Sequence, residues 1–264
     1  MRKPQQSYWD ERLKQNWGPH GVGSLVYGRQ YNTWLYRVRR RAFMGLCRSL
    51  KLRPLESRIL DVGCGTGFYI EQWRRLGADK IVGLDFSAVV IERLRRQFPP
   101  AVSLEEMDIG EPTVPLPAGS FDIVTAFDVL FHIVDDDRYD NALRNISTIL
   151  HPGGLFLYSD NFIHGQPREY QEYWKSRSLG DIGDALDRAG FQILDRVPVF
   201  VLMNSPVDSG SQVFQLCWDF AMKSVSRSEV IGFTLGALLY PLELILRRFV
   251  NEGPSTEIMV CRKT

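Results

Sequence analysis

Short apolar runs alternate with amphipathic stretches from residue 56 onwards, and this alternation is the strongest structural signal in the chain. Six runs have the length of strands, and a seventh strand lies within Phe191–Met203. The six runs are Ile59–Val62, Ile81–Asp85, Val102–Met107, Phe121–Ala126, Leu155–Ser159 and Glu257–Cys261. Stretches with helical character separate several of them: Phe68–Leu76, Ser87–Phe98, Asp137–Leu150 and Leu179–Ala189. Near-continuous apolar strands need cover on both faces. The pattern therefore predicts an α/β fold with a doubly wound, mostly parallel sheet of seven strands.

Two segments do not follow this alternation. Residues 1–55 are rich in Trp, Tyr and Arg, and we expect them to form an N-terminal helical cap. Residues 56–264 then form the main domain, in which residues 204–255 separate the sixth strand from the last one. A structureless loop of that length is uncommon in a compact domain. We therefore expect a helical insertion before the last strand, with one helix at Gln212–Val225, where apolar residues recur at helical spacing.

Charge is unevenly distributed, although the 264 residues carry a net charge of only +1. No Asp or Glu occurs between Arg12 and Leu55, whereas ten basic residues fall there: Arg12, Lys14, Arg29, Arg37, Arg39, Arg40, Arg41, Arg48, Lys51 and Arg53. Such a segment is either a solvated helix face or a patch for an anionic substrate, a carrier protein, nucleic acid or a lipid headgroup. The net charge by itself says nothing about nucleic acid, which we do not expect as the partner.

The four cysteines, Cys47, Cys64, Cys217 and Cys261, are scattered and form no Cys-x-x-Cys pair. This spacing argues against a structural zinc site or a disulfide framework, so we expect no metal. Free thiols favour a reducing compartment. The segment Met1–Gln15 lacks the apolar core of a signal peptide, and we expect a cytoplasmic protein.

The longest apolar stretch, Val230–Leu246, is interrupted by Thr234, Pro241 and Glu243, and falls short of a clean membrane-spanning helix. Three interpretations stay open. The stretch could form a lid or a homodimer surface over an apolar substrate, it could lie at a membrane surface beside Arg247-Arg248, or it could be half of a helical pair packed on the domain. A peripheral membrane contact and a homodimer are therefore both retained as hypotheses.

The segment Ile59–Gly67 carries the clearest chemical signal. It reads Ile-Leu-Asp-Val-Gly-Cys-Gly-Thr-Gly, a strand that runs into a turn with glycines at alternate positions, and a helix follows at once. Glycines at a strand-to-helix turn let the backbone bend sharply and let a ligand approach closely. The first turn of the helix offers free N–H groups and a partial positive charge. The segment therefore predicts a site for a nucleoside-containing cofactor.

Two further acids decide which cofactor fits. Asp85 ends the second strand, 22 residues after Gly63, and Asp108 ends the third. A dinucleotide fingerprint would be G-x-G-x-x-G, whereas the spacing here is G-x-G-x-G. With these features the chain resembles the class I S-adenosylmethionine-dependent methyltransferases of the small-molecule type, which have a Rossmann-like fold. The matching segments occur in the family's order: Ile59–Phe68, Val82–Ser87, Met107–Ile109, Phe121–His132 and Leu150–Gly154. The resemblance covers about residues 56–203 and 256–262.

The resemblance implies that the glycine turn binds the methionine and ribose parts of S-adenosylmethionine. Gly63, Cys64, Gly65 and Gly67 would pass under the cofactor, and Asp61 would help to hold its amino group. A single Asp at a strand end could equally cap a turn. The end of the fourth strand would line the methionine side of the pocket, through Phe127 and Asp128.

The resemblance assigns the rest of the cofactor to the second and third strand ends. Asp85 would accept hydrogen bonds from the ribose hydroxyls, Phe86 would pack on the adenine, and Ser87 completes this part of the motif. Asp108 would accept from the adenine amino group, while Ile109 would give its backbone amide to the ring. Carboxylates that accept from hydroxyls and amines are chemically reasonable partners for these groups.

Catalytic residues are poorly encoded for this reaction, because the methyl group is already activated and mainly needs an aligned nucleophile. Four candidate bases are His132, Asp160, His164 and His20. His132 could instead be a packing histidine, and Asp160 and His164 could be ordinary loop residues. His20 lies between prolines and glycines and could sit on a lid. Aromatic residues of the loop after the fifth strand could form a pocket wall: Tyr170, Tyr173 and Trp174.

The sequence therefore predicts a methyltransferase that acts on an oxygen or nitrogen of a small, partly apolar metabolite, with secondary metabolism as a candidate setting. No Asn/Asp-Pro-Pro-Tyr element follows the fourth strand, which disfavours exocyclic amines of nucleobases as acceptors. No cysteine lies near that strand, which disfavours covalent attack on a pyrimidine. Two alternatives are an RNA-modifying methyltransferase that uses the basic N-terminal segment, and a non-catalytic binding protein that keeps the fold.

Overall fold

The computed structural model describes residues 4–170 and 173–264. Contacts divide the chain into two compact units, each assembled from segments that are distant in the sequence. The sheet unit comprises Met1–Lys14, Arg53–Asp195 and Ile258–Thr264, and the helical unit comprises Gln15–Leu52 and Arg196–Glu257. The segment predicted as one N-terminal cap is thus shared between the units, whereas the predicted insertion lies within the helical unit.

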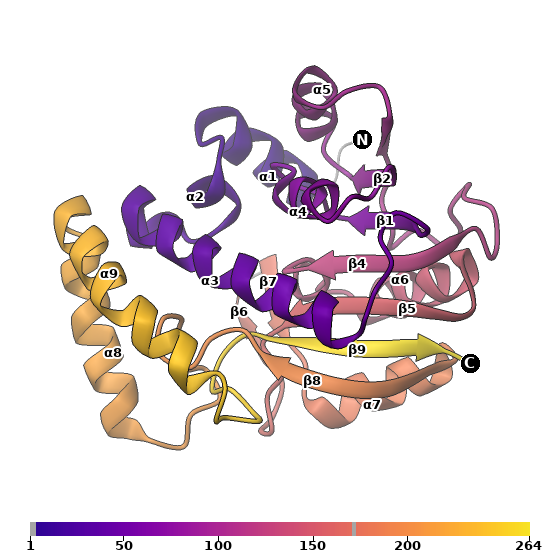
Figure 1. The fold of residues 1–264 in the computed structure, drawn as a ribbon. Coiled ribbons are helices and arrows are strands. Elements are labelled where there is room, and N and C mark those ends of the chain that lie inside the picture. Colours follow the sequence, from indigo (N-terminus) through magenta and orange to yellow (C-terminus); the bar gives the residue numbers. More distant parts are fainter. Residues whose placement is uncertain (1–3, 171–172) are drawn as a thin grey trace. The chain divides into compact units, whose positions relative to one another are not determined.

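The predicted seven-stranded sheet is confirmed, and its strand order is β3-β2-β1-β4-β5-β9-β8 (Figure 1). The strands are β1 (Arg58–Val62), β2 (Lys80–Asp85), β3 (Val102–Glu106), β4 (Phe121–Phe127), β5 (Leu150–Asp160), β8 (Phe191–Pro198) and β9 (Glu257–Lys263). Strands β1 to β5 pair in parallel, whereas β9 runs in the opposite direction (Figure 1). The chain order reverses between β1 and β4, where ligands bind in open α/β sheets.

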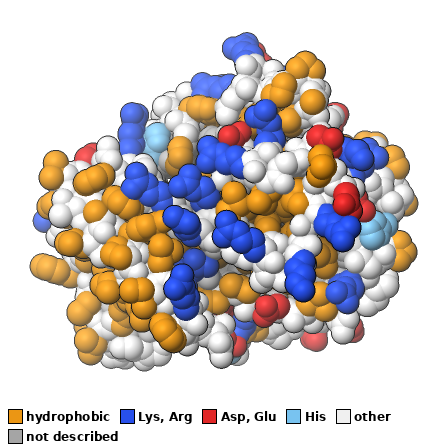
Figure 2. All heavy atoms as spheres, viewed as in Figure 1, with side chains coloured by type: hydrophobic (Ala, Val, Ile, Leu, Met, Phe, Trp, Pro, Cys, Tyr) orange, Lys and Arg blue, Asp and Glu red, His pale blue; other side chains and the backbone are white. Residues whose placement is uncertain are grey.

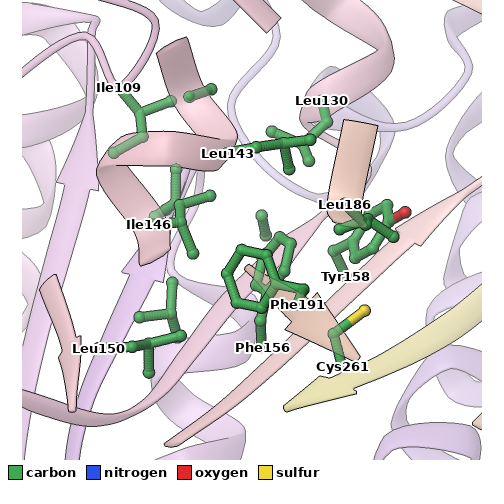
Figure 3. Close-up of a cluster of buried hydrophobic side chains, with 14 of the residues drawn as sticks. Ile109, Leu130, Leu143, Ile146, Leu150, Phe156, Tyr158, Leu186, Phe191 and Cys261 are labelled. Carbon is green, nitrogen blue, oxygen red and sulfur yellow. The ribbon is translucent and has the colours of Figure 1, made fainter. Parts of the chain in front are cut away.

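Helices cover the strands of the sheet unit: α1 (Pro4–Gln15), α4 (Phe68–Arg75), α5 (Ala88–Gln97), α6 (Asp136–Ile149) and α7 (Leu179–Arg188). The apolar faces of α6 and α7 bury Leu143, Ile146 and Leu186 in one core cluster with strand residues such as Phe156 and Phe191 (Figure 3). This packing fixes the strands whose carboxyl ends carry the predicted site residues.

A small hairpin in the loop after β5 was not predicted. It pairs β6 (Arg168–Tyr170) with β7 (Trp174–Ser176) in antiparallel register. Three-residue strands give too short an alternation of apolar and polar residues to be recognised from sequence. The hairpin places Tyr173 and Trp174 in the sheet unit, while the side chain of Tyr170 lies outside the described part of the structure.

The helical unit is built on α2 (Pro19–Val22), the short 3-10 helix η1 (Leu25–Tyr27), α3 (Gly28–Ser49), α8 (Gln212–Val225) and α9 (Glu229–Leu246). Helices α3 and α9 pack lengthwise in the same direction, because Gly232 faces Tyr31 and Gly236 faces Trp34. A Cβ atom on Gly236 would lie only 2.3 Å from Trp34 Cδ1, so glycine permits the close approach of the two helices.

Buried and capping carboxylates tie the helical unit together. The carboxylate of Glu229 accepts hydrogen bonds of 2.8 Å from the first backbone N–H groups of α3, those of Arg29 and Gln30. Glu243 is fully buried and accepts from three consecutive backbone N–H groups, those of residues 201–203. The segment Phe191–Met203 holds the sixth strand as predicted: β8 occupies its first part and stops at Pro198. The next two N–H groups donate to the carbonyl oxygen of Thr256, and those of residues 201–203 donate to Glu243.

The other element boundaries follow the predictions closely. Gln212–Val225 is confirmed as α8. The predicted strand Leu155–Ser159 is the second half of β5, which begins at Leu150 because a register shift opposite Phe121 absorbs the residues between Leu150 and Leu155. Helix α9 confirms that the apolar stretch is helical, despite Pro241 within it.

Helix α9 differs from an ordinary core helix in its exposure. Among the described residues, it is the one helix that is long and apolar enough to cross a membrane, with a mean hydropathy of 1.6 over 18 residues. Only 17% of that window is buried. Length and composition alone are weak evidence for a membrane span, since core helices and signal sequences can share them. The exposure nevertheless leaves a large apolar surface to be explained.

Candidate functional site

The turn between β1 and α4 adopts a conformation that demands glycine. Gly63, Gly65 and Gly67 all have left-handed backbone, with φ of 63°, 51° and 78°. A Cβ atom on Gly63 would lie 2.4 Å from Val129 Cγ2, and one on Gly67 would lie 2.4 Å from Phe98 Cε2. Both the conformation and the neighbours therefore exclude side chains, and the backbone stays open to a ligand.

Cys64 lies inside this turn and is held by its backbone. Its N–H donates to the carbonyl oxygen of Leu84 at 3.0 Å, which ties the turn to β2. The thiol is buried, and burial raises its pKa well above the usual value, with the charges of Asp85 and Asp61 adding to the effect. The thiol is therefore protonated at neutral pH and unreactive. Cys64 contributes packing and a fixed backbone to the site.

Asp61, near the end of β1, is a buried carboxylate with one unused oxygen. It is 2% exposed, and its Oδ1 accepts a hydrogen bond of 2.7 Å from Thr125 Oγ1 on β4. Its Oδ2 is buried and has no hydrogen-bond partner in the described part of the chain. Burial raises the pKa of Asp61 to about 7, although the hydrogen bond from Thr125 acts in the opposite direction. A buried acceptor without a donor is costly, so the site fits a ligand that carries a cationic donor.

Asp85, at the end of β2, binds the glycine turn as well. Its Oδ2 accepts from the N–H of Gly65 and its Oδ1 from the N–H of Ser87, each at 3.0 Å. The side chain is 5% exposed, and burial raises its pKa to about 6 against the effect of these hydrogen bonds. Each oxygen keeps acceptor capacity for a further donor. Asp85 is thus placed to hold the turn and to accept from ligand hydroxyls.

Helix α1 covers the end of β2 through contacts that the sequence did not reveal. The hydroxyl of Ser87 donates to the buried carboxylate of Asp10, and Gln6 Nε2 donates to the carbonyl oxygen of Phe86 at 2.6 Å. Arg93 of α5 donates to the carbonyl oxygen of Leu13 at 2.8 Å. Asp10 lies in a charged N-terminal stretch without periodicity, so no sequence signal distinguished it from a solvated acid.

Asp108 and Ile109 follow β3, which ends at Glu106 and not at Asp108 as predicted, and both have protein partners. Asp108 Oδ1 accepts from the N–H of Gly110 at 3.0 Å, and Oδ2 forms an ion pair with Arg138 at 2.5 Å. Ile109 is buried in the core (Figure 3), and its carbonyl oxygen accepts from Asn145 Nδ2 at 2.9 Å. Arg138, in the first turn of α6, fixes Asp108, and the assignment of both residues to adenine stays a prediction.

The end of β4 is held in an unusual conformation. Asp128 has φ of 59°, which is rare for a residue with a side chain. The hydroxyl of Ser159 accepts from the N–H of Asp128 at 2.9 Å and donates to its carboxylate at 3.0 Å. The ring of Phe127 lies 4.1 Å from that of Tyr69, the second residue of α4. The sequence prediction did not include Tyr69 in the site, although an aromatic residue directly after the glycine turn could have pointed to it.

His132, at the end of the short 3-10 helix η2 (Leu130–His132), is enclosed by aromatic residues. Its Nδ1 lies 2.8 Å from the carbonyl oxygen of Tyr173, and its ring meets the edge of Trp9 of α1 at 5.0 Å. Burial lowers the pKa of His132 to about 4, and the charge of Arg12 adds to this effect. Because a carbonyl oxygen only accepts, Nδ1 carries the proton of the neutral ring. The other nitrogen, Nε2, then carries no proton and can accept a hydrogen bond.

The remaining candidates occupy different environments. Asp160 ends β5, is 2% exposed and accepts from the N–H of Asn161 at 2.6 Å; burial raises its pKa to about 7. His164 is exposed in the following loop. His20 belongs to α2 of the helical unit, whereas the other three candidates belong to the sheet unit. The described residues contain no group of three or more His, Cys, Asp or Glu arranged for a metal ion.

Part of the chain is similar in sequence to known methyltransferases. Residues 59–154 match a family described as a methyltransferase domain. A curated relative from Mycolicibacterium smegmatis, described as a probable S-adenosylmethionine-dependent methyltransferase, is 26% identical over 147 residues, which is 54% of each chain. A ubiquinone biosynthesis O-methyltransferase from Xanthomonas axonopodis is 34% identical over 116 residues, 43% of this chain and 47% of the relative. The matched region spans about half the length of these relatives.

Solved structures extend the likeness of fold to the whole chain. A 1,6-didemethyltoxoflavin-N1-methyltransferase from Burkholderia thailandensis, solved with its substrate and S-adenosylhomocysteine, superposes with a TM-score of 0.57 at 18% identity. The superposition covers 100% of this chain and 92% of that one. At this identity the likeness concerns the fold alone. It shows that helices outside the matched domain also have counterparts in a methyltransferase of known structure.

Proposed function

We propose that the chain transfers a methyl group to an oxygen or nitrogen of a small, partly apolar molecule, and that residues 59–154, which match a methyltransferase domain, bind the S-adenosylmethionine that supplies it. The observation that carries this proposal is the pair formed by the glycine turn and the unused buried oxygen of Asp61. The three glycines of the turn let a nucleoside approach the backbone, and a buried carboxylate oxygen with unused acceptor capacity accommodates an ammonium group.

The residues of the site fit S-adenosylmethionine at both ends of the molecule. Asp61 would hold the amino group of the methionine part, and Asp85 would accept from the ribose hydroxyls. Asp108 and Ile109 would meet the adenine. When bound, the cofactor supplies a methyl group that a positively charged sulfur already activates. The protein therefore has to fix two molecules in the correct relative position and keep water away.

The end of β4 and its neighbours would form the acceptor side of the site. The Ser159 hydroxyl locks the backbone of Asp128, and Phe127 packs on Tyr69, so this wall is rigid. A rigid wall holds a nucleophile with little loss of entropy in the reaction step. Around the hairpin, Tyr8 and Tyr173 approach to 4.7 Å between ring centres, and such aromatic surfaces favour a partly apolar substrate.

His132 would position the acceptor atom through Nε2. With a pKa lowered to about 4, the ring is neutral at pH 7 and accepts a hydrogen bond from a substrate hydroxyl, but it is a weak base for full proton removal. Asp160, with its pKa raised to about 7, is the stronger base of the two. We therefore assign orientation to His132 and, where the acceptor has to lose a proton, proton removal to Asp160.

The names of the relatives support a small acceptor. One curated relative is an O-methyltransferase of ubiquinone biosynthesis, and one structural relative is an N1-methyltransferase of 1,6-didemethyltoxoflavin. They do not identify the acceptor atom in this chain. We favour an oxygen acceptor on a molecule with an apolar part, because a hydroxyl is the group that a neutral histidine nitrogen orients.

The proposal is tested with a donor that carries a tritiated methyl group and three acceptor pools: phenols with apolar chains, aromatic amines, and bulk RNA. We expect label in the phenols or amines. At a subsaturating concentration of the methyl donor, Asp61→Asn should lower transfer about 100-fold, whereas the matched exposed change Asp79→Asn should not lower it. His132→Gln should lower kcat by about 10- to 100-fold and leave donor binding unchanged.

Other outcomes would overturn parts of the proposal. Label that enters only RNA, with an affinity that falls steeply with salt, would contradict the small-molecule acceptor. Absence of donor binding in calorimetry would contradict methyl transfer altogether and would favour a binding protein that keeps the fold.

A further inference from the structure

Helices α8 and α9 of the helical unit present an apolar surface to solvent. On α9 the exposed residues recur every three, four or eight positions, which places them on one side of the helix: Val230, Leu238, Leu242 and Ile245, continued by Phe249. Helix α8 adds an apolar stripe of its own, with Val213, Leu216 and Phe220 each about 70% exposed or more. Figure 2 shows hydrophobic side chains gathered over this part of the molecule. Monomeric soluble proteins rarely expose a patch of this size.

The opposite side of α9 is firmly bound to its own unit. Gly232 and Gly236 pack on α3, and the carboxylate of Glu243 accepts three backbone hydrogen bonds. The helix is therefore fixed along its length on one side and bare on the other. A helix that crossed a bilayer would have to break these contacts and carry Glu243 into hydrocarbon, which is costly. The geometry fits a helix that lies at an interface.

Arginines line a cavity at the C-terminal ends of α3 and α9. The cavity has a volume of about 530 Å³ and combines Arg41, Arg48, Arg247 and Arg248 with apolar residues such as Leu46 and Leu244. In the described part of the chain, Arg41, Arg48 and Arg248 form no ion pair with a carboxylate, and all three are exposed. Arg247 donates to the carbonyl oxygen of Pro198 at 3.0 Å, which holds it in place.

We propose that the helical unit docks on the surface of an anionic phospholipid bilayer, with the bare faces of α8 and α9 among the acyl chains and the arginine cavity on lipid phosphate groups. The charge of the unit supports this occupant. Its segments contain 12 Lys and Arg against 6 Asp and Glu, whereas the rest of the chain contains 20 against 25. An apolar face bordered by basic residues has the chemistry of an interfacial helix.

A second copy of the chain fits this surface less well. In a symmetric dimer the same patch meets itself, so the excess of basic residues in the helical unit would be brought together in the two copies. Lipid phosphates carry the opposite charge and remove this repulsion. Docking on a bilayer would also give the site access to acceptors with apolar parts, but the inference does not depend on the proposed methyl transfer.

The test is flotation of the intact chain with vesicles of phosphatidylcholine alone and of phosphatidylcholine with one third phosphatidylglycerol. We expect binding to the anionic vesicles that weakens in 0.5 M salt. The variant L238S/L242S/I245S should reduce the partition constant on anionic vesicles at least tenfold. The variant R41Q/R248Q should reduce this constant about fivefold per arginine, so that it approaches the partition constant on neutral vesicles. Matched exposed changes in the sheet unit, L55S/I193S and R53Q/R96Q, should leave it within twofold.

Circular dichroism and binding of S-adenosylhomocysteine, measured on the same variants, show that each is folded. Because both readouts are independent of vesicles, a failure of docking is distinguished from a failure of the proposed function. Equal flotation of wild type with neutral and anionic vesicles, or unchanged flotation of the stripe variant, would overturn the proposal. Sedimentation velocity in which the stripe variant only loses self-association would also overturn it, in favour of a dimer face. Saturable binding of inorganic phosphate with no vesicle binding would overturn it in favour of a soluble anion.

Discussion

The sheet unit and the helical unit have opposite surfaces, and the whole-chain composition conceals this difference. The net charge of +1 is the sum of an acidic sheet unit and a basic helical unit. Among the described residues, 12 of the 17 large exposed hydrophobic side chains lie in the helical unit. An average over such a chain is close to that of an ordinary soluble domain. The distribution of charge and apolar surface, and not its total, indicates what each unit binds.

Buried acids show the same contrast at the level of single groups. In the sheet unit, Asp61 Oδ2 is buried and accepts no hydrogen bond from the described residues, and the pKa of Asp61 rises to about 7. In the helical unit, Glu243 is equally buried but accepts three backbone hydrogen bonds. A buried acid with unused capacity is prepared for a ligand, whereas a saturated one holds the fold. This difference separates the two units by function.

The largest expected effect comes from the glycine turn of the sheet unit. Gly67→Ala introduces a Cβ atom 2.4 Å from Phe98 at a φ of 78°. We expect the free energy of unfolding to fall by about 2 kcal/mol or more and donor binding to be lost. Gly183→Ala in α7 is the control, because its Cβ would meet nothing within 4 Å. Urea denaturation and calorimetry measure both effects, and a Gly67→Ala chain that binds normally would show that the turn does not contact the donor.

The corresponding substitution in the helical unit, at Gly236, should lower the stability without weakening the binding of the methyl donor. Gly236→Ala places a Cβ atom 2.3 Å from Trp34, so α3 and α9 must separate. We expect a loss of about 1–3 kcal/mol in the free energy of unfolding. Gly45→Ala in α3 meets nothing within 4 Å and should cost nothing. Vesicle flotation of the folded Gly236→Ala chain should weaken, whereas its affinity for S-adenosylhomocysteine should change less than twofold.

The raised pKa of Asp61 predicts a pH dependence of stability in the absence of the donor. A group whose pKa is higher in the folded chain stabilises it fully below the unfolded value of about 3.9, and this contribution is lost as pH rises through the folded value. Between pH 6.5 and 8 the unfolding free energy should therefore fall up to about pH 7 and then level off, because the pKa values of Asp61 and Asp160 are both raised to about 7.

Two other titratable groups, His132 and Glu257, decide why stability is measured between pH 6.5 and 8 and which control variant is used. The pKa of His132 is lowered to about 4, so its contribution grows with pH but is complete by about pH 6.5. Glu257 of the helical unit has its pKa raised to about 7 and adds to the fall. Denaturation at three pH values should show a shallower slope for Asp61→Asn and for Glu257→Gln. Saturating S-adenosylhomocysteine should remove the Asp61 share alone, and an unchanged slope in Asp61→Asn would contradict the assignment.

Two helix caps give the smallest expected effects. The hydroxyl of Ser87 accepts from the N–H of Val90 at the start of α5 and also donates to Asp10. The hydroxyl of Ser228 accepts from the N–H of Ile231 at the start of α9 and has no second partner among the described residues. Ser87→Ala should cost about 1–2 kcal/mol and Ser228→Ala about 0.5–1 kcal/mol. Thermal denaturation measures the pair, and equal losses would show that the contact with Asp10 contributes nothing.

Sequence reasoning recovered the sheet unit well and the helical unit only in outline. The seven strands and the glycine turn were predictable because periodicity and backbone conformation are local properties. Three features were not predictable: the contacts of Asp10 with Ser87, the φ of Asp128, and the exposure of one face of α9. Each depends on segments that meet only after folding. The division of the first 55 residues between two units follows from the same kind of long-range packing.

Calorimetric titration of S-adenosylhomocysteine at pH 6 and pH 8 tests the central claim most directly, since that claim is that Asp61 binds the donor through its unused oxygen. For the wild type we expect a tighter complex at pH 8, where Asp61 is ionised. For Asp61→Asn we expect affinity reduced by about 100-fold, which corresponds to about 2.7 kcal/mol, and no dependence on pH. Equal dissociation constants for wild type and Asp61→Asn at both pH values would contradict the account.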